Sequence, residues 1–210
     1  MDHDQIEARA LAIADAHGCH TVILYGSHAR GDADDSSDVD LLCIRDGGPA
    51  LRDARVIDGV YFDAFVQPQE ALAAADPALL RIVGGRALRE RDGAGAALLD
   101  RVRDLFAQGP DPLAADDRTM RIVWSHKMLG RLGRDDGIDI DYRRMAFIVQ
   151  ALEDYFALRT RWFRGPKDAF AWLQIHDDAG YGAFEAAMQP AAGPDALAAL
   201  VDAVYGPLPG

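Results

Sequence analysis

Residues 21–44 constrain the fold of this chain most strongly, because two apolar runs flank a polar segment that contains two glycines. The first run, Thr21 to Tyr25, ends at Gly26-Ser27, and the second follows Asp38 as Val39-Asp40 and then Leu41 to Ile44. Side chains alternate across a β-strand, so Asp38 and Asp40 are expected on the same face. Two carboxylates this close repel each other unless a cation compensates them. The pattern therefore predicts a divalent metal site at the start of the second strand.

The other acids of this segment have a simpler interpretation. Asp32, Asp34 and Asp35 lie among glycine and serine residues, a composition typical of turns, and we interpret them as turn residues. That interpretation does not extend to Asp38 and Asp40, because the apolar residues between and after them predict a strand. A carboxylate pair there destabilises the fold unless something neutralises it.

Composition limits the class of protein. The chain has 210 residues, half of them hydrophobic, which is enough for one large domain or two small ones. It contains no apolar run of membrane-spanning length, and the first ten residues lack the basic and apolar regions of a signal peptide. We therefore expect a soluble, cytoplasmic protein with no membrane partner, in which Cys19 and Cys43 are reduced thiols.

The formal net charge of -12 bears on the partners. A protein that holds nucleic acid neutralises phosphates with a basic surface, so the acidic balance argues against DNA or RNA as a partner. An acidic field attracts a small cationic acceptor, although acidic composition is also an ordinary means of staying soluble. A cationic acceptor is therefore compatible with the charge without being required by it.

Strand and helix patterns extend on both sides of residues 21–44. Apolar spacing predicts a helix over 4–17, with Asp4 and Glu7 as its capping box. Runs at 52–57 and 60–66 are joined by Asp58-Gly59, which predicts a hairpin. In the second of these runs Asp63 stands alone among apolar and aromatic residues. A buried aspartate needs a partner, whereas on a half-exposed strand it would face solvent.

The rest of the chain is mainly helical. We expect two short helical pieces over 69–83, an edge strand near 86–90 and a helix over 95–108. Two prolines and a glycine at 109–112 cannot continue a helix, and beyond them the apolar spacing is helical throughout. The prediction is an α+β fold: a domain over 1–108, a linker over 109–113 and an all-helical domain over 114–210.

The central motif resembles the signature of the nucleotidyltransferase superfamily, to which DNA polymerase beta and the aminoglycoside nucleotidyltransferases belong. That signature is a glycine-serine turn, a short helix ending in glycine, and an Asp-x-Asp strand. Here it reads Gly26-Ser27-His28-Ala29-Arg30-Gly31, then Ser37-Asp38-Val39-Asp40-Leu41. The resemblance implies a mixed sheet with flanking helices, and a third carboxylate from a neighbouring strand. Asp63 matches that carboxylate, either as a metal ligand or as a general base.

The resemblance also implies ligands. Mg²⁺ and ATP, or another nucleoside triphosphate, would bind at Asp38, Asp40 and Asp63, with the backbone after Gly26 and the Ser27 hydroxyl on the phosphates. Arg30 lies one turn from Ser27 and either contacts phosphate or faces solvent. Lys127 and Lys167 are the only lysines of the chain, and either reaches the triphosphate or lies on a solvated helix face.

The function implied is transfer of a nucleoside monophosphate, AMP in the first instance, to a hydroxyl of a small molecule, with release of pyrophosphate. An aminoglycoside-like or lincosamide-like antibiotic is the example that the family suggests, and such a reaction confers antibiotic resistance. Glu153 and Asp154 are candidates for binding a cationic acceptor or acting as its base. The alternatives are a protein-adenylylating enzyme of the antitoxin type and an inactive nucleotide-binding module. Both a monomer and a homodimer stay open.

Overall fold

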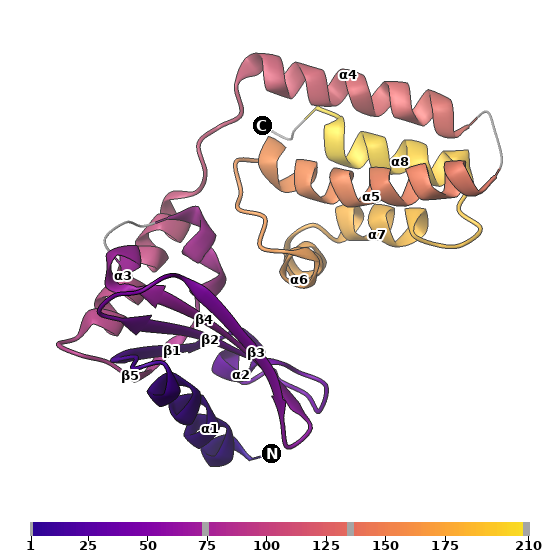
Figure 1. Ribbon diagram of the computed structural model, residues 1–210. Helices are drawn as coiled ribbons and strands as arrows, with labels where there is room; N and C mark the ends of the chain where they lie inside the picture. Colours follow the sequence, from indigo (N-terminus) through magenta and orange to yellow (C-terminus); the bar gives the residue numbers. More distant parts are fainter. Residues whose placement is uncertain (1, 73–75, 134–136, 208–210) are drawn as a thin grey trace. The chain divides into compact units, whose positions relative to one another are not determined.

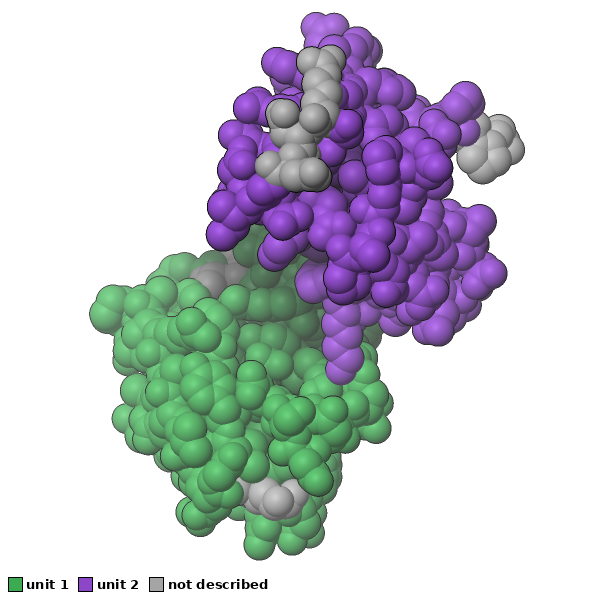
Figure 2. All heavy atoms as spheres, turned by 90° about the vertical axis from the view of Figure 1, so that its right-hand side faces the viewer, with its two compact units in different colours: residues 1–108 green, residues 109–210 purple. Residues whose placement is uncertain are grey.

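The structure is a computed structural model that describes residues 2–72, 76–133 and 137–207. The chain folds into two compact units, Met1–Gln108 and Gly109–Gly210 (Figure 2). Helix α3 (Ala94–Gln108) ends the first unit, and the next helix, α4, begins at Ala115. The segment between these helices contains the two prolines that the sequence places there.

The first unit is built on one mixed sheet with the strand order β3-β4-β2-β1-β5 (Figure 1). The pair β2–β4 is parallel and the other three pairs are antiparallel. Its strands are β1 (Thr21–Tyr25), β2 (Val39–Arg45), β3 (Leu51–Ile57), β4 (Val60–Pro68) and β5 (Arg86–Arg89). The predicted fold class is therefore confirmed, including the edge position of the short strand β5.

Helices cover the two faces of this sheet. Helix α1 (His3–Ala16) lies on one face, where Ile6, Ala10 and Ile13 pack with alternate residues of β1, β2 and β4 (Figure 1). Helix α3 lies on the other face (Figure 1) and packs with the 3₁₀ helix η2 (Pro77–Ile82), while a second 3₁₀ turn, η1 (Gln69–Leu72), directly follows β4. Tyr25 and Asp40 belong to this second face. Successive residues of a strand point to opposite faces, and the chain neighbours of these two residues point toward α1.

The N-terminus of α1 differs from the prediction. Asp2 is its N-cap and accepts a hydrogen bond from the Gln5 backbone, while the Gln5 side chain accepts one from the Asp2 backbone. The capping box is therefore Asp2–Gln5, and the predicted pair Asp4–Glu7 lies inside the helix. Both pairs have the spacing of a capping box, so spacing alone does not choose between them.

The hairpin β3–β4 forms as its dipeptide predicts. Asp58 has a φ of 50° and Gly59 a φ of 84°, and two consecutive positive values are what a two-residue turn of type I′ requires. The turn sets the register, since Ile57 then pairs with Val60 and Ala54 with Asp63. This register decides which side chains surround Asp63.

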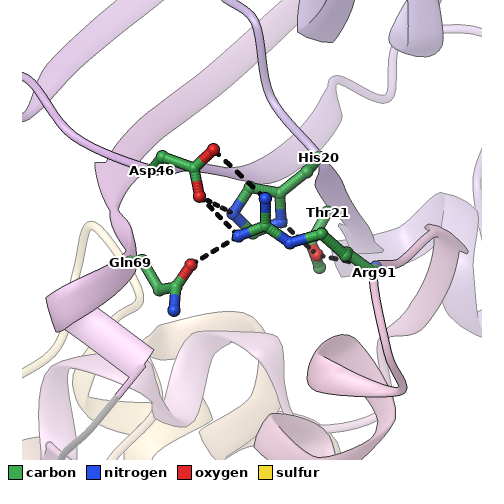
Figure 3. A network of polar contacts seen from close by, with 5 residues as sticks. All are labelled: His20, Thr21, Asp46, Gln69 and Arg91. Carbon is green, nitrogen blue, oxygen red and sulfur yellow. Dashed lines mark hydrogen bonds and ion pairs between the residues drawn. The ribbon is translucent and has the colours of Figure 1, made fainter.

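A polar network ties together the end of the sheet that lies opposite Tyr25 (Figure 3). The Arg91 guanidinium donates to both carboxylate oxygens of Asp46, at 2.5 and 3.1 Å, and to the Gln69 side chain at 2.6 Å. The Thr21 hydroxyl receives the Arg91 backbone N–H at 3.3 Å and contacts His20 Nδ1 at 2.9 Å. These contacts join β1, η1 and the segments that follow β2 and β5.

The second unit is helical. Its helices are α4 (Ala115–Leu132), α5 (Ile138–Leu158), α6 (Pro166–His176), α7 (Asp178–Ala187) and α8 (Pro194–Tyr205). Their core contains Phe147, Tyr155, Phe184 and Leu200, none of which is more than 2% exposed. Among the described residues no helix is both long and apolar enough to cross a membrane.

Candidate active site

The glycine-serine turn begins directly where β1 ends. Gly26 is the first residue of the short helix α2 (Gly26–Arg30) and has a φ of +73°, a conformation that residues with a side chain rarely adopt. A Cβ at this position would lie 2.3 Å from Asp40 Oδ2. Glycine is therefore required twice, for the backbone conformation and for the close approach of the Asp40 carboxylate.

Two neighbouring strands, β2 and β4, bring the acids together, and β1 places Tyr25 beside them. Tyr25 at the end of β1 pairs with Asp40 on β2, and Asp40 pairs with Asp63 on β4. Residues that are directly opposite in a sheet share a face, so both carboxylates lie on the face away from α1. Asp38 directly precedes β2 and is exposed. The predicted acid set is thus assembled at one end of the sheet by strand register.

The electrostatics of this end centre on Asp40. Burial, followed by the charges of Asp63 and Asp38, raises the pKa of Asp40 to about 6, and the guanidinium groups of Arg30 and Arg81 offset part of that rise. A raised carboxyl pKa means that negative charge is disfavoured at this position. A divalent cation would relieve that excess of negative charge.

Asp63 has a partner that the sequence interpretation missed. Arg52 on β3 donates from Nε to Asp63 Oδ1 at 2.6 Å and from Nη2 to Oδ2 at 2.7 Å. This is a bidentate pair, the strongest common geometry between arginine and a carboxylate. The Asp63 side chain is 12% exposed and that of Arg52 is 56% exposed. In this structure the buried aspartate is neutralised by an arginine from the neighbouring strand.

A second arginine at the site was also missed. The Arg81 guanidinium, carried by η2, lies 4.0 Å from the centre of the Phe65 ring and 6.0 Å from that of Tyr25. Burial raises the pKa of the Tyr25 hydroxyl, with further contributions from the charges of Asp40 and Asp63. The acids are therefore bordered by two aromatic rings and by cations that could bind phosphate.

The other predicted contacts in the first unit lie on α2. Ser27 is half-buried in the first turn of that helix, and its carbonyl accepts the Gly31 N–H at 2.9 Å. Arg30 lies at the end of α2 and forms an ion pair with Asp32 at 3.4 Å. The effect of Arg30 on the pKa of Asp40 places its charge near the acids.

The predicted residues of the second unit have different surroundings. Lys127 is exposed on α4 and Lys167 is exposed in the first turn of α6. Asp154 is 1% exposed and accepts hydrogen bonds from Arg121, from Gln150 at 3.0 Å and from the Tyr205 hydroxyl at 2.7 Å. It is therefore a core residue of the helical unit and does not present its carboxylate to an acceptor. Glu153 is exposed.

The donor set fits a divalent metal ion in part. Asp38 and Asp40 offer the oxygen ligands that Mg²⁺ prefers, and burial, with the nearby charges of Asp63 and Asp38, raises the pKa of Asp40. The described residues contain no cluster of three or more histidine, cysteine, aspartate or glutamate side chains arranged around a metal position, and Arg52 holds the third acid. The Asp38–Asp40 pair fits a cation, whereas Asp63 would first have to leave Arg52.

Comparison with known proteins identifies the same segment. Residues 15–74 match the family model of the nucleotidyltransferase domain, and this segment contains the turn, β2 and β4. A solved nucleotidyltransferase-like protein from Exiguobacterium sibiricum is similar over 95% of this chain and 73% of its own, with 11% identity and a TM-score of 0.43. None of the curated proteins matches the chain.

The match over residues 15–74 therefore supports the resemblance of the central motif to the nucleotidyltransferase superfamily. Domains of this class move a nucleotidyl group, so the match supports a transferase activity of that general kind. A nucleoside triphosphate and a divalent metal are the general requirements of such a domain.

Proposed function

We propose that the protein transfers AMP from ATP to a hydroxyl group of a small molecule and releases pyrophosphate, with Mg²⁺ as the metal. The acceptor oxygen forms a bond to the α-phosphorus while the bond from that phosphorus to the bridging oxygen of pyrophosphate breaks. The hydroxyl proton passes to a base or to water. A cationic acceptor of the aminoglycoside or lincosamide type, and with it a role in antibiotic resistance, fits the net charge of -12.

One observation carries this proposal. The Asp40 carboxylate lies close to Gly26 and near Asp63 and Asp38, and its pKa is raised to about 6. Keeping such a group costs stability, and a purely structural role does not explain it. A site for a metal-bound triphosphate does, because the carboxylates of Asp38 and Asp40 would hold Mg²⁺, which neutralises phosphate charge when bound.

The residues around the acids have complementary roles in the proposal. The Ser27 hydroxyl and the backbone after Gly26 bind the terminal phosphates, and Arg30 adds a positive charge beside them. Asp63 is the third acid, either as a ligand or as the base that receives the acceptor proton. Lys127 and Lys167 remain predicted phosphate contacts. Most of the rate enhancement then comes from positioning and charge neutralisation.

The test is incubation with Mg²⁺, each labelled nucleoside triphosphate in turn, and a panel of aminoglycosides, lincosamides and candidate proteins. We expect label transfer from ATP to a small molecule, lost in Asp40→Asn and retained in Asp35→Asn. Asp35 is an exposed acid of the same loop, so its substitution controls for a change of charge alone.

Three other outcomes correct the proposal. Transfer from a different triphosphate changes the nucleotide, and transfer only to protein favours the protein-modifying alternative. Absence of pyrophosphate release with every acceptor, together with retained ATP binding, favours an inactive nucleotide-binding module.

A further inference from the structure

The described residues of the second unit leave an apolar surface exposed. Helices α4 and α5 are the two longest helices of the described chain. Seven of their large apolar side chains are between 38% and 88% exposed. We call them the α4–α5 stripe: Met120, Val123 and Trp124 on α4, and Ile138, Tyr142, Met145 and Val149 on α5. Single exposed apolar residues need no explanation, but several of them on each of two helices that pack on each other indicate an interaction site.

The spacing within each helix puts these residues on one side of it. Met120, Val123 and Trp124 are three and four positions apart, as are Tyr142, Met145 and Val149, and such neighbours share a helix face. The opposite faces of the same helices are buried, at Ser125 and Leu132 on α4 and at Ala151 and Tyr155 on α5. Each helix thus has a buried side and an exposed apolar side, and the exposed side has no packing partner among the described residues of the unit.

The area of the stripe matches a dimer interface. Side chains of this size offer on the order of 150 Å² each, so the stripe presents roughly 600 Å² of apolar surface at the exposures given. A stable interface buries about 800 Å² per partner, of which about two thirds is apolar in homodimers. The stripe is therefore large enough for a specific contact between two copies of this chain.

Charge selects the second copy as the occupant. On α4, Asp116 and Asp117 lie in the first turn and Arg131 lies in the last, with the apolar residues of the stripe between them. A two-fold axis through the stripe and perpendicular to α4 makes α4 of one copy antiparallel to α4 of the other. Each acidic end then meets the basic end of its partner. Asp139 and Asp141, at the start of α5, already have arginine partners at 4.0 Å on their own helix.

We propose that the α4–α5 stripe is the interface of a homodimer, in which α4 packs against its symmetry mate in antiparallel orientation. The apolar residues form the centre of the contact, and Arg131 of each copy pairs with Asp116 and Asp117 of the other. This inference rests on the second unit alone and does not depend on the reaction of the first.

Sedimentation velocity of the full chain tests the proposal. We expect a mass of twice 22.8 kDa at micromolar concentration. The double substitution Val123→Lys and Val149→Lys should weaken association on the order of 100-fold or more, because it brings like charges into the contact. Ile175→Lys, on α6, alters a side chain that is 78% exposed outside the stripe and should leave the dimer intact.

Charge reversal tests the antiparallel geometry. Arg131→Glu should weaken the dimer, and adding Asp116→Lys and Asp117→Lys to that variant should restore it. Circular dichroism of each variant checks that the helices remain folded. A wild-type monomer at every concentration overturns the proposal, as does a dimer that is insensitive to the double lysine substitution. Failure of the reversed charges to restore the dimer overturns the antiparallel arrangement.

Discussion

Gly26 and Asp40 show how a single contact shapes the acidic end of the sheet. The turn must leave β1 sharply, and the Asp40 carboxylate occupies the space that any side chain at position 26 would need. The glycine-serine turn and the Asp-x-Asp strand therefore depend on each other, because only glycine at position 26 leaves space for the Asp40 carboxylate. The sequence indicates this pairing only through the spacing of the motif, because the distance between the two residues depends on strand register.

The first prediction concerns Gly26→Ala. The new Cβ would lie 2.3 Å from Asp40 Oδ2, so the carboxylate or the turn must move, and a displacement of about 1 Å costs on the order of 100-fold in rate. Gly18→Ala is the matched control, since Gly18 also has a positive φ, +64°, but nothing lies within 4 Å of its Cβ position. Nucleotidyl transfer should fall in the first variant only, while thermal melting shows the backbone strain common to both. Equal activity in the two variants would show that the close approach of Asp40 to Gly26 is not needed for the reaction.

The second prediction concerns Arg52→Gln. Without the bidentate partner, the Asp63 carboxylate becomes available to a cation, so Mg²⁺ should bind more tightly than to the wild type if Asp63 is a ligand. Arg55→Gln is the control, because Arg55 lies on the same strand but pairs with Asp53. Calorimetric titration with Mg²⁺ measures the difference. Unchanged affinity in Arg52→Gln would assign Asp63 to proton transfer or to structure.

At the scale of elements, the sequence predicts most of the first unit and part of its site. The Asp58-Gly59 turn predicts the hairpin and its register. In that register Arg52 pairs with Phe65, so Arg52 lies on the same face of the sheet as Asp63. The Arg52–Asp63 pair was therefore accessible from sequence, given the turn. Arg81 was not, because it lies on a 3₁₀ helix whose orientation no periodicity fixes.

The third prediction tests the link between α1 and β3. Asp53 accepts hydrogen bonds from Arg55 and contacts His17 Nε2 at 2.6 Å, and the Arg55 pair holds the pKa of Asp53 below its usual range. An aspartate whose pKa is lowered in the folded state stabilises the fold at pH values above its ordinary pKa. This contribution is lost as the pH falls through the folded-state pKa. Asp53→Asn should cost at most about 1 kcal/mol at neutral pH, and the difference should vanish once the pH is below the folded-state pKa. Urea unfolding over pH measures it, and a difference that persists in acid contradicts this assignment.

The fourth prediction separates two adjacent acids of α5. Asp154 is 1% exposed and is paired with Arg121 and Tyr205, so Asp154→Asn should lower the unfolding free energy by roughly 3 kcal/mol. Glu153→Gln, at the exposed neighbouring position, should change it by less than about 0.5 kcal/mol. The midpoint of denaturant unfolding gives both values. An Asp154→Asn variant as stable as the wild type would show that the carboxylate does not hold the core together.

At the scale of the whole molecule, the two units are predicted from different kinds of sequence pattern. The first unit contains the matched nucleotidyltransferase segment and all the acids of the candidate site. The second unit is predicted from helical periodicity alone, and periodicity does not say which apolar face is buried and which is exposed. That is why the α4–α5 stripe could not be recognised from the sequence, in which exposed and buried apolar faces have the same helical spacing.

The central claim is that Asp38 and Asp40 hold a metal-bound triphosphate, and calorimetric titration with ATP and Mg²⁺ tests it most directly. We predict that the wild type and Asp35→Asn bind ATP in a Mg²⁺-dependent manner, and that Asp40→Asn loses the Mg²⁺ dependence. The same affinity with and without Mg²⁺ in the wild type, or unaltered Mg²⁺-dependent binding in Asp40→Asn, would contradict it.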